Sequence, residues 1–179
     1  MEKKNGNWTI RKTEEVFAND YFKVYNDSVI NPDGKEGEYA TIEFISGVSV
    51  LPIDDEDNVY LTEQFRYAAG KNTLEVVAGG VEDESPIEAA RREIKEELGI
   101  TAEEFTEVGT IQLDHSIIKA PSTLFIARKL TFGKTNRDDA EEMKMVKIKF
   151  DEAVKKVLNG EITHAPSCVL ILSAKVNRK

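Results

Sequence analysis

Alternation of apolar and polar residues in the first quarter of the chain predicts three β-strands, over residues 8–17, 21–30 and 38–45. Residues 31–34, Asn-Pro-Asp-Gly, separate the second strand from the third and are a strong turn signal. We therefore expect an antiparallel ribbon. Three strands bury little apolar surface alone, so the ribbon must pack on the main domain or on a second subunit.

The pattern changes near residue 47, where strands begin to alternate with helices. The predicted strands span residues 48–54, 59–67, 73–77, 107–113, 123–130 and 143–150, and helices are expected between Ser85 and Gly99, over 151–158 and over 166–176. Mixed strands and a few helices predict an α+β fold, an α/β/α sandwich in which helices pack across a mixed sheet. We expect two parts, a β ribbon over residues 1–46 and a main domain over residues 47–179.

Residues 85–99 carry the signals that begin and end a helix. Ser85 is a good N-cap, Pro86 suits the first helical position, and Glu88 completes a capping box with Ser85. Gly99 is placed to end the helix, because glycine accepts the left-handed conformation. The apolar residues recur at helical spacing and form one stripe: Ile87, Ala90, Ile94 and Leu98.

Acidic residues crowd one face of this predicted helix. Glu93 and Glu97 are four residues apart and so lie one turn apart, with Glu96 beside them. Like charges at this spacing destabilise a helix by about 0.2–0.5 kcal/mol per pair, and a divalent cation removes that penalty. Hard carboxylate oxygens of this kind suit magnesium. A solvated helix face is the alternative interpretation of a glutamate-rich run.

The acidic helix also matches a known signature. Residues 92–100 have the spacing R-E-U-x-E-E-x-G-U, where U is aliphatic, and seven residues separate Glu84 from Arg92. This arrangement resembles the Nudix box of enzymes that hydrolyse a nucleoside diphosphate linked to another group. The glycine expected six residues before Glu84 falls on Ala78. A loop shortened by one residue, with Gly79 in the role of that glycine, explains the departure.

Flanking motifs extend the resemblance over nearly the whole chain. Residues 64–67 (Gln-Phe-Arg-Tyr), 74–79 (Leu-Glu-Val-Val-Ala-Gly) and 159–162 (Asn-Gly-Glu-Ile) are similar to motifs of the ADP-ribose pyrophosphatase branch of the Nudix family. The N-terminal ribbon and its turn fit that branch as well. The resemblance implies a Nudix fold, with a mixed β-sheet between helices, and a homodimer formed through the ribbon.

The resemblance assigns roles to residues in and before the box. Glu93 and Glu97 would hold the metal ion, Mg²⁺ with Mn²⁺ as an alternative, and Glu96 would assist them. Arg92 would orient a box glutamate, a role that suits its bidentate fork. The backbone carbonyl of Ala78 would be a further metal ligand.

An acidic loop over residues 136–143 matches a late loop that supplies a further metal ligand and, in some members of the branch, the catalytic base. Glu141 is the first candidate for this position, with Asp139 and Glu142 as alternates. The identity of the base stays open among these three residues and Glu96. A solvated acidic loop is the alternative interpretation.

Substrate contacts are implied for three residues outside the box. Arg66 would touch a substrate phosphate, and Glu75 would contact the substrate or a dimer mate. Trp8 would stack on a nucleobase, with packing of the ribbon as the alternative. Residues 114–122 lack the proline-glycine of the branch and place His115 there, as a substrate contact or an ordinary loop histidine.

Charge and composition narrow the partners and the compartment. A net charge of −9 disfavours non-specific binding to nucleic acid, which relies on basic patches. No apolar run approaches the length of a membrane span, and the first residues lack a signal-peptide core. The single cysteine, Cys168, cannot form an internal disulfide, which favours a reducing compartment. We expect a cytoplasmic protein with no nucleic-acid or membrane partner.

The sequence therefore predicts a magnesium-dependent enzyme that hydrolyses the diphosphate bond of ADP-ribose or a related nucleotide sugar to a nucleoside monophosphate and a sugar phosphate. The same chemistry on a GDP-sugar, a dinucleoside polyphosphate or a dinucleotide cofactor is a second hypothesis. A non-catalytic nucleotide-binding regulatory module is the third. The third is disfavoured because the box keeps all its carboxylates.

Overall fold

The computed structural model describes residues 2–134 and 143–177 of the 179-residue chain. The chain divides into two compact units. The ribbon unit comprises Met1–Ile45 and Gln112–Pro121, and the sandwich unit comprises Ser46–Ile111 and Ser122–Lys179. A segment from the middle of the chain therefore completes the N-terminal unit.

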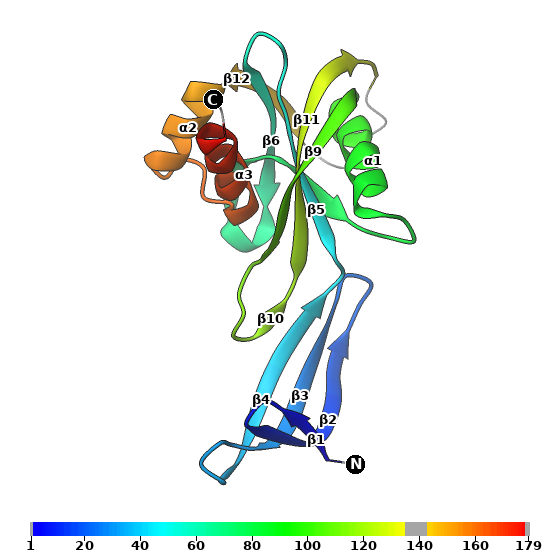
Figure 1. Ribbon diagram of the computed structural model, residues 1–179, viewed down its shortest axis with the longest axis vertical. Coiled ribbons are helices and arrows are strands. Elements are labelled where there is room, and N and C mark those ends of the chain that lie inside the picture. The colour runs from blue at the N-terminus through cyan, green and yellow to red at the C-terminus, as the bar shows by residue number, and fades with distance from the viewer. Residues whose placement is uncertain (1, 135–142, 178–179) are drawn as a thin grey trace. The chain divides into compact units, whose positions relative to one another are not determined.

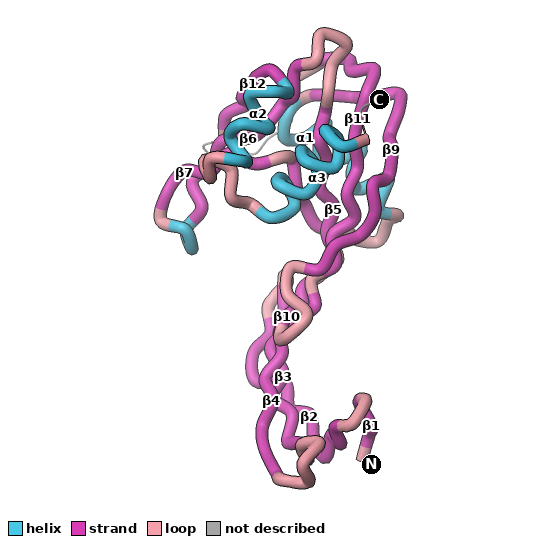
Figure 2. The backbone as a smooth tube through the Cα atoms, turned by 60° about the vertical axis from the view of Figure 1, so that its left-hand side comes forward, coloured by secondary structure: helices cyan, strands magenta, loops and turns pink. Residues whose placement is uncertain are grey.

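The described part of the ribbon unit consists of strands and loops (Figure 2). Its strands are β1 (Lys3–Asn5), β2 (Trp8–Ala18), β3 (Phe22–Ile30), β4 (Glu36–Phe44) and β10 (Ile118–Lys119), in the order β1-β2-β3-β4-β10. The three predicted strands pair antiparallel, and Gly34 in the predicted turn has a φ of 85°. Strands β1 and β10 were not predicted. Strand β10 pairs in parallel with β4, with Ile118 opposite Ile42.

The sandwich unit holds two further sheets and the described helices. Its strands are β5 (Gly47–Pro52), β6 (Asn58–Arg66), β7 (Lys71–Glu75), β8 (Val77–Gly80), β9 (Ile100–Gln112), β11 (Pro121–Phe132) and β12 (Lys144–Lys149). Its helices are α1 (Pro86–Leu98), α2 (Phe150–Leu158) and α3 (Ala165–Val176), with a 3₁₀ turn, η1 (Tyr67–Ala69). The strand orders are β8-β5-β11-β9 and β12-β6-β7. Strand β5 pairs in parallel with β11 and antiparallel with β8, so the sheet is mixed, as predicted.

Strand β5 is buried on both faces and separates two apolar cores. Leu51 and Leu124 share one core with residues of α2 and α3, whereas Val50 and Phe125 share the other with residues of α1. Neighbouring residues alternate between the cores because the side chains of a strand repeat every two residues. Figure 1 shows α1 on one side of these strands and α2 and α3 on the other. The predicted α/β/α sandwich is confirmed.

The helices of the sandwich unit are short. Helices α1, α2 and α3 have 13, 9 and 12 residues, whereas a membrane-spanning helix needs about 20. Within residues 2–134 and 143–177, no helix is long and apolar enough to cross a membrane.

Candidate active site

Helix α1 places the acidic residues of the box. At its start the backbone N–H of Ser85 donates to Glu88 Oε2 at 3.0 Å, which forms the predicted capping box. At its end Gly99 takes the left-handed conformation, with a φ of 64°. Ala90 and Ile94 of the predicted stripe are fully buried in the core. The two ends and the buried stripe together determine which way the box side chains point.

The guanidinium of Arg92 binds three carboxylates at once. Its Nε and Nη2 donate to Glu84 Oε1 at 2.9 and 2.7 Å, and its Nη1 donates to Glu93 Oε1 at 2.6 Å and Glu96 Oε2 at 3.2 Å. Nη2 also donates to the carbonyl of Gly80 at 3.0 Å. Burial lowers the pKa of Arg92, but the hydrogen bonds and charges of these glutamates raise it overall. The guanidinium of Arg92 thus joins the loop before α1 to two carboxylates of the helix.

The carboxylate of Glu93 lies directly against the backbone at Gly79. A Cβ atom at position 79 would lie 2.0 Å from Glu93 Cδ and 2.1 Å from its Oε1, far inside contact distance. Only glycine leaves room for the glutamate at this close approach of strand and side chain. The contact supports the predicted one-residue shift of the box glycine from position 78 to Gly79.

Glu93 is a buried acid, with 9% of its surface exposed. Burial raises its pKa, and the charge and hydrogen bond of Arg92 offset part of that effect. An ionised carboxylate in such a place needs positive charge close by. A divalent cation beside Glu93 would add that charge, so this position suits a metal ligand.

The predicted metal ligands of the box come from one helix and one strand. Glu93 and Glu97 lie one turn apart on α1, and Ala78 is in β8. Among residues 2–134 and 143–177, no three His, Cys, Asp or Glu residues form a ready-made metal cluster. Arg92 instead binds oxygens of Glu93 and Glu96. The available donors are hard oxygens, as magnesium requires, so these residues fit the ion by their chemistry.

Three further acidic candidates, Glu141, Asp139 and Glu142, lie outside the described residues. Of the four candidates for the base, Glu96 is the one that the structure places. It is half-buried on α1, and its Oε2 accepts a hydrogen bond from Arg92. The choice among the four stays a prediction.

Arg66 is held by the buried carboxylate of Glu75. Its Nε and Nη2 donate to Oε1 and Oε2 of Glu75 at 3.2 and 2.6 Å, and the hydroxyl of Thr73 donates to Oε1 at 2.7 Å. Burial raises the pKa of Glu75, but the hydrogen bonds from Arg66 and Thr73 lower it overall. Glu75 is 4% exposed, whereas 41% of the Arg66 side chain is exposed. Glu75 therefore fixes the orientation of an arginine that solvent and ligands can reach.

The start of helix α3 meets the end of β7 through two residues, His164 at the N-cap and Ser167 in the first turn, that the sequence analysis did not assign to the site. His164 Nδ1 lies 2.8 Å from Ser167 Oγ and 3.6 Å from Glu75 Oε2. Ser167 Oγ accepts a hydrogen bond from the N–H of Val76, 91 residues away in the sequence. Burial lowers the pKa of His164. No local motif marks these residues, because only the fold brings α3 to the end of β7.

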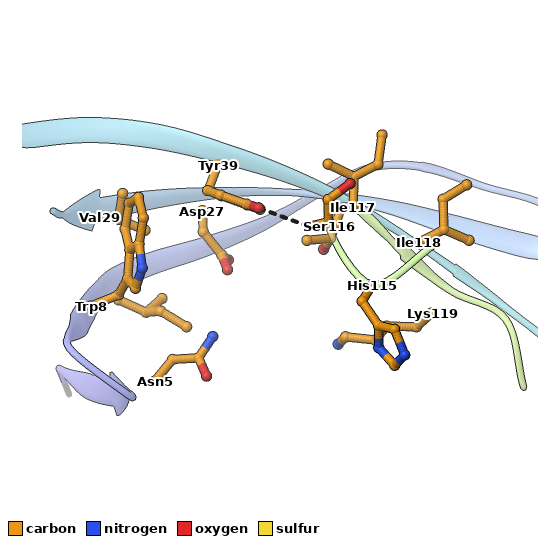
Figure 3. Close-up of a pocket in the computed structure, with 12 residues that line it drawn as sticks. Asn5, Trp8, Asp27, Val29, Tyr39, His115, Ser116, Ile117, Ile118 and Lys119 are labelled. Carbon is orange, nitrogen blue, oxygen red and sulfur yellow. Dashed lines mark hydrogen bonds between the residues drawn. The ribbon is translucent and has the colours of Figure 1, made fainter. Parts of the chain in front are cut away.

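Trp8 and His115 share a pocket within the ribbon unit (Figure 3). The ring of Trp8 meets that of Tyr39 edge to face, with centroids 5.4 Å apart. The pocket has a volume of about 280 Å³. The sequence predicted each of Trp8 and His115 as a candidate ligand contact, but it did not predict that they line one pocket.

A glutamate-rich helix on a mixed sheet, with one arginine joining its carboxylates, is the arrangement expected of a Nudix protein. The NUDIX domain family matches residues 43–166, and the chain belongs to this family. The N-terminal domain of nucleoside diphosphate sugar hydrolases matches residues 8–42. The resemblance inferred from the box is confirmed.

Several full-length relatives agree with this assignment. The ADP-ribose pyrophosphatase of Bacillus subtilis (strain 168) is 27% identical over 166 residues, covering 91% of this chain and 89% of that protein. The ADP-ribose pyrophosphatase of Mycobacterium tuberculosis is 24% identical, covering 90% and 80%. The methanol dehydrogenase activator of Bacillus methanolicus is 25% identical, covering 89% and 88%.

A solved structure agrees on the fold. The crystal structure of an ADP compounds hydrolase superposes with a TM-score of 0.85 and 21% identity, covering 97% of this chain and 95% of that one. With the family match and the relatives, the chain is a Nudix pyrophosphohydrolase of the ADP-ribose pyrophosphatase-like kind, as predicted.

We predict that Gly79→Ala displaces the carboxylate of Glu93 and lowers hydrolytic turnover by about 100-fold, because small misplacements of a catalytic group are costly. Turnover and circular dichroism of the purified variant measure the effect. Gly133→Ala is the matched control, since a Cβ there would make an ordinary contact, 3.6 Å from the carbonyl of Gly99. Wild-type turnover in Gly79→Ala would show that the position of Glu93 does not matter.

Proposed function

We propose that the protein hydrolyses the diphosphate bond of ADP-ribose or a related nucleotide sugar, with Mg²⁺ (or Mn²⁺) as cofactor, to a nucleoside monophosphate and a sugar phosphate. The observation that carries the proposal is the contact of Arg92 with Glu84, Glu93 and Glu96 on a Nudix helix. Relatives named ADP-ribose pyrophosphatase and ADP-sugar pyrophosphatase support the substrate class.

The chemistry that we propose divides between the metal and the protein. Glu93, Glu97 and the carbonyl of Ala78 would hold Mg²⁺, with Glu141 as a further ligand. When bound, the ion lowers the pKa of a water molecule and offsets charge on the phosphate oxygens. A carboxylate, Glu96 or one of the late acidic residues, takes the proton from the attacking water. The water oxygen bonds to one phosphorus, the bridging P–O bond breaks, and the sugar phosphate or the nucleotide leaves.

Arg92 serves this chemistry as a positioning residue. Its hydrogen bonds hold Glu93 and Glu96 in place, and its bond to Glu84 ties the loop before α1 to the helix. The guanidinium also offsets the repulsion between the acids until a metal ion arrives. The site therefore keeps its shape while it carries a high density of negative charge.

Arg66 is the residue that we propose to grip the diphosphate. Its side chain is 41% exposed, and Glu75 accepts hydrogen bonds from two of its nitrogens. The arginine is therefore already oriented, so less conformational entropy is lost when a phosphate binds. We infer that Glu75 acts on the substrate through Arg66 rather than by direct contact, because Glu75 is buried.

The other predicted substrates and the regulatory role stay as alternatives. The segment 114–122 lacks the proline-glycine of the ADP-ribose branch, which favours another nucleoside diphosphate derivative such as a GDP-sugar. One relative is named methanol dehydrogenase activator, and for this reason we retain a regulatory module as an alternative function. Measured turnover with identified products separates the enzymes from the regulatory module.

We predict that purified protein with Mg²⁺ cleaves ADP-ribose or another nucleotide sugar faster than any nucleoside triphosphate, and that Glu97→Gln lowers this turnover by at least about 100-fold. Glutamine keeps the shape of glutamate but loses the charge that holds a metal ion. Product identification by chromatography across a substrate panel measures both effects. Glu107→Gln, at an exposed position on β9, is the matched control.

Two outcomes would contradict this prediction. Faster cleavage of a triphosphate than of every nucleotide sugar would overturn the substrate class and leave only the Nudix chemistry. Wild-type turnover of Glu97→Gln at saturating Mg²⁺ would remove Glu97 from the proposed site.

We predict that Arg66→Lys lowers kcat/KM for the nucleotide sugar by roughly 10- to 100-fold, because a lysine cannot replace charge-assisted hydrogen bonds made by a planar fork. Steady-state kinetics and thermal unfolding of the same samples measure the effect, which should be far larger on kcat/KM than on stability. Arg11→Lys is the control, since Arg11 pairs with Glu36 on an exposed surface of the ribbon unit. Equal kinetics in Arg66→Lys and wild type would exclude the phosphate contact.

We propose a homodimer in which the ribbon unit packs on a second copy of the chain. Apolar side chains are exposed on this unit, and the ring of Phe22 contacts those of Phe17 and Phe44, with centroids 5.5 and 5.1 Å apart. Sedimentation velocity at micromolar concentration should show a dimer, and Phe17→Glu should shift it toward monomer. Leu158→Glu, at an exposed position on α2, should leave it unchanged. A fully active wild-type monomer would refute the proposal.

A further inference from the structure

The start of helix α3 lies against the strand segment that carries Glu75. Ser167, in the first turn of α3, is fully buried, and its Oγ makes two hydrogen bonds within the part of the chain that the structure describes. The backbone N–H of Val76 donates to this oxygen at 2.9 Å, and His164 Nδ1 lies 2.8 Å from it. The start of α3 is thereby joined to the backbone next to Glu75.

Donor and acceptor capacity indicates which nitrogen of His164 carries the proton. A serine hydroxyl has one proton to donate and two lone pairs that accept. Ser167 Oγ accepts from the Val76 N–H, and its own proton needs an acceptor because the hydroxyl is buried. Among the described residues, His164 Nδ1 provides that acceptor. The neutral imidazole then carries its proton on Nε2 and has none to offer from Nδ1.

The carboxylate of Glu75 lies between two cationic side chains, Arg66 and, when protonated, His164. Its Oε1 accepts from Arg66 Nε at 3.2 Å and from the hydroxyl of Thr73 at 2.7 Å, whereas its Oε2 accepts from Arg66 Nη2 at 2.6 Å. His164 Nδ1 lies 3.6 Å from Oε2, too far for a hydrogen bond. A proton on Nδ1 would make it a charged donor that faces Oε2, in competition with Arg66 for that oxygen.

Two charged groups face His164 in the described part of the chain, Glu75 on β7 and Arg66 on β6. Burial lowers the pKa of His164, the charge of Glu75 raises it, and the charge of Arg66 lowers it, so that the pKa is lowered overall. The imidazole is therefore neutral at neutral pH and gains its second proton only in acid.

We propose that His164 is a positioning residue for Arg66. In its neutral form it accepts the proton of Ser167 and leaves Oε2 of Glu75 to the guanidinium. In its protonated form it shares Oε2 and loosens the hold of Glu75 on Arg66. The effect on substrate binding rests on the proposed function, in which Arg66 grips the diphosphate. The coupling between the imidazole and the guanidinium does not.

NMR spectroscopy of the metal-free protein measures the tautomer and the titration of His164. The chain has two histidines, so His115→Asn assigns the two imidazole signals. At neutral pH we expect Nδ1 of His164 without a proton, and a pKa below about 6.5, the ordinary value of histidine. Glu75→Gln should lower this pKa further, because it removes the negative charge that favours the imidazolium. A proton on Nδ1 at neutral pH would overturn the proposal.

The Nε–H signal of Arg66 reports on the position of the guanidinium without substrate, and Arg66→Lys assigns this signal by removing it. In wild type the signal should move with the titration of His164, because Nε donates to the same carboxylate. His164→Asn should abolish this movement, since asparagine accepts a hydroxyl proton, is a good N-cap and does not titrate. His164→Ala, which removes the acceptor of the Ser167 proton, should shift the signal at neutral pH.

Steady-state kinetics with a nucleotide sugar at saturating Mg²⁺ connect this coupling to substrate binding. In wild type KM should rise by roughly threefold or more as the pH falls through the pKa of His164, and this rise should be absent from His164→Asn. His164→Ala should raise KM by a similar factor at neutral pH with little change in kcat. Asn177→Ala, at an exposed position just after α3, is the matched control and should keep both constants.

Failure of this role and failure of the proposed function are distinguishable. If the protein hydrolyses no nucleotide sugar, the proposed function is overturned, and the NMR signals still decide whether His164 positions Arg66. The positioning role is overturned if the Arg66 signal does not follow the titration of His164. It is also overturned if His164→Asn and wild type show the same rise of KM in acid.

Discussion

The burial of Glu93 between Arg92 and Gly79 is the constraint on which the candidate site depends. A carboxylate with 9% exposure is unfavourable unless a positive charge lies beside it, and the guanidinium of Arg92 supplies that charge at 2.6 Å. The same guanidinium binds Glu84, Glu96 and the carbonyl of Gly80, so the loop, helix α1 and strand β8 all contact Arg92. Removing the charge of Arg92 would leave the buried Glu93 carboxylate without a cation. Filling the space at Gly79 would displace that carboxylate.

A second arginine is held by the same physical means. Arg66 forms two hydrogen bonds with the buried carboxylate of Glu75, and Thr73 and His164 lie close to that carboxylate. In both places a partly buried acid fixes the direction of a guanidinium fork. The two differ in exposure, since Arg92 is enclosed by acids, whereas Arg66 leaves much of its side chain open to a ligand. Arg92 therefore suits the support of carboxylates, and Arg66 suits the contact with phosphate.

An acidic chain that acts on anionic phosphates has to place its positive charge locally. The net charge of −9 gives no general attraction for a nucleotide. Within the sandwich unit, the oriented guanidiniums of Arg66 and Arg92 supply positive charge, and the proposed Mg²⁺ would add to it.

The sequence by itself determined helix α1, the main strands and the Nudix family, because caps, periodicity and motif spacing are local signals. It also identified Arg92 and the acids that Arg92 binds. Only the tertiary structure decided that Gly79 makes room for Glu93, that Glu75 anchors Arg66, and that residues 112–121 join the ribbon unit. These contacts depend on the packing of the strands and helices against one another. A single sequence has no local periodicity or motif that predicts such packing.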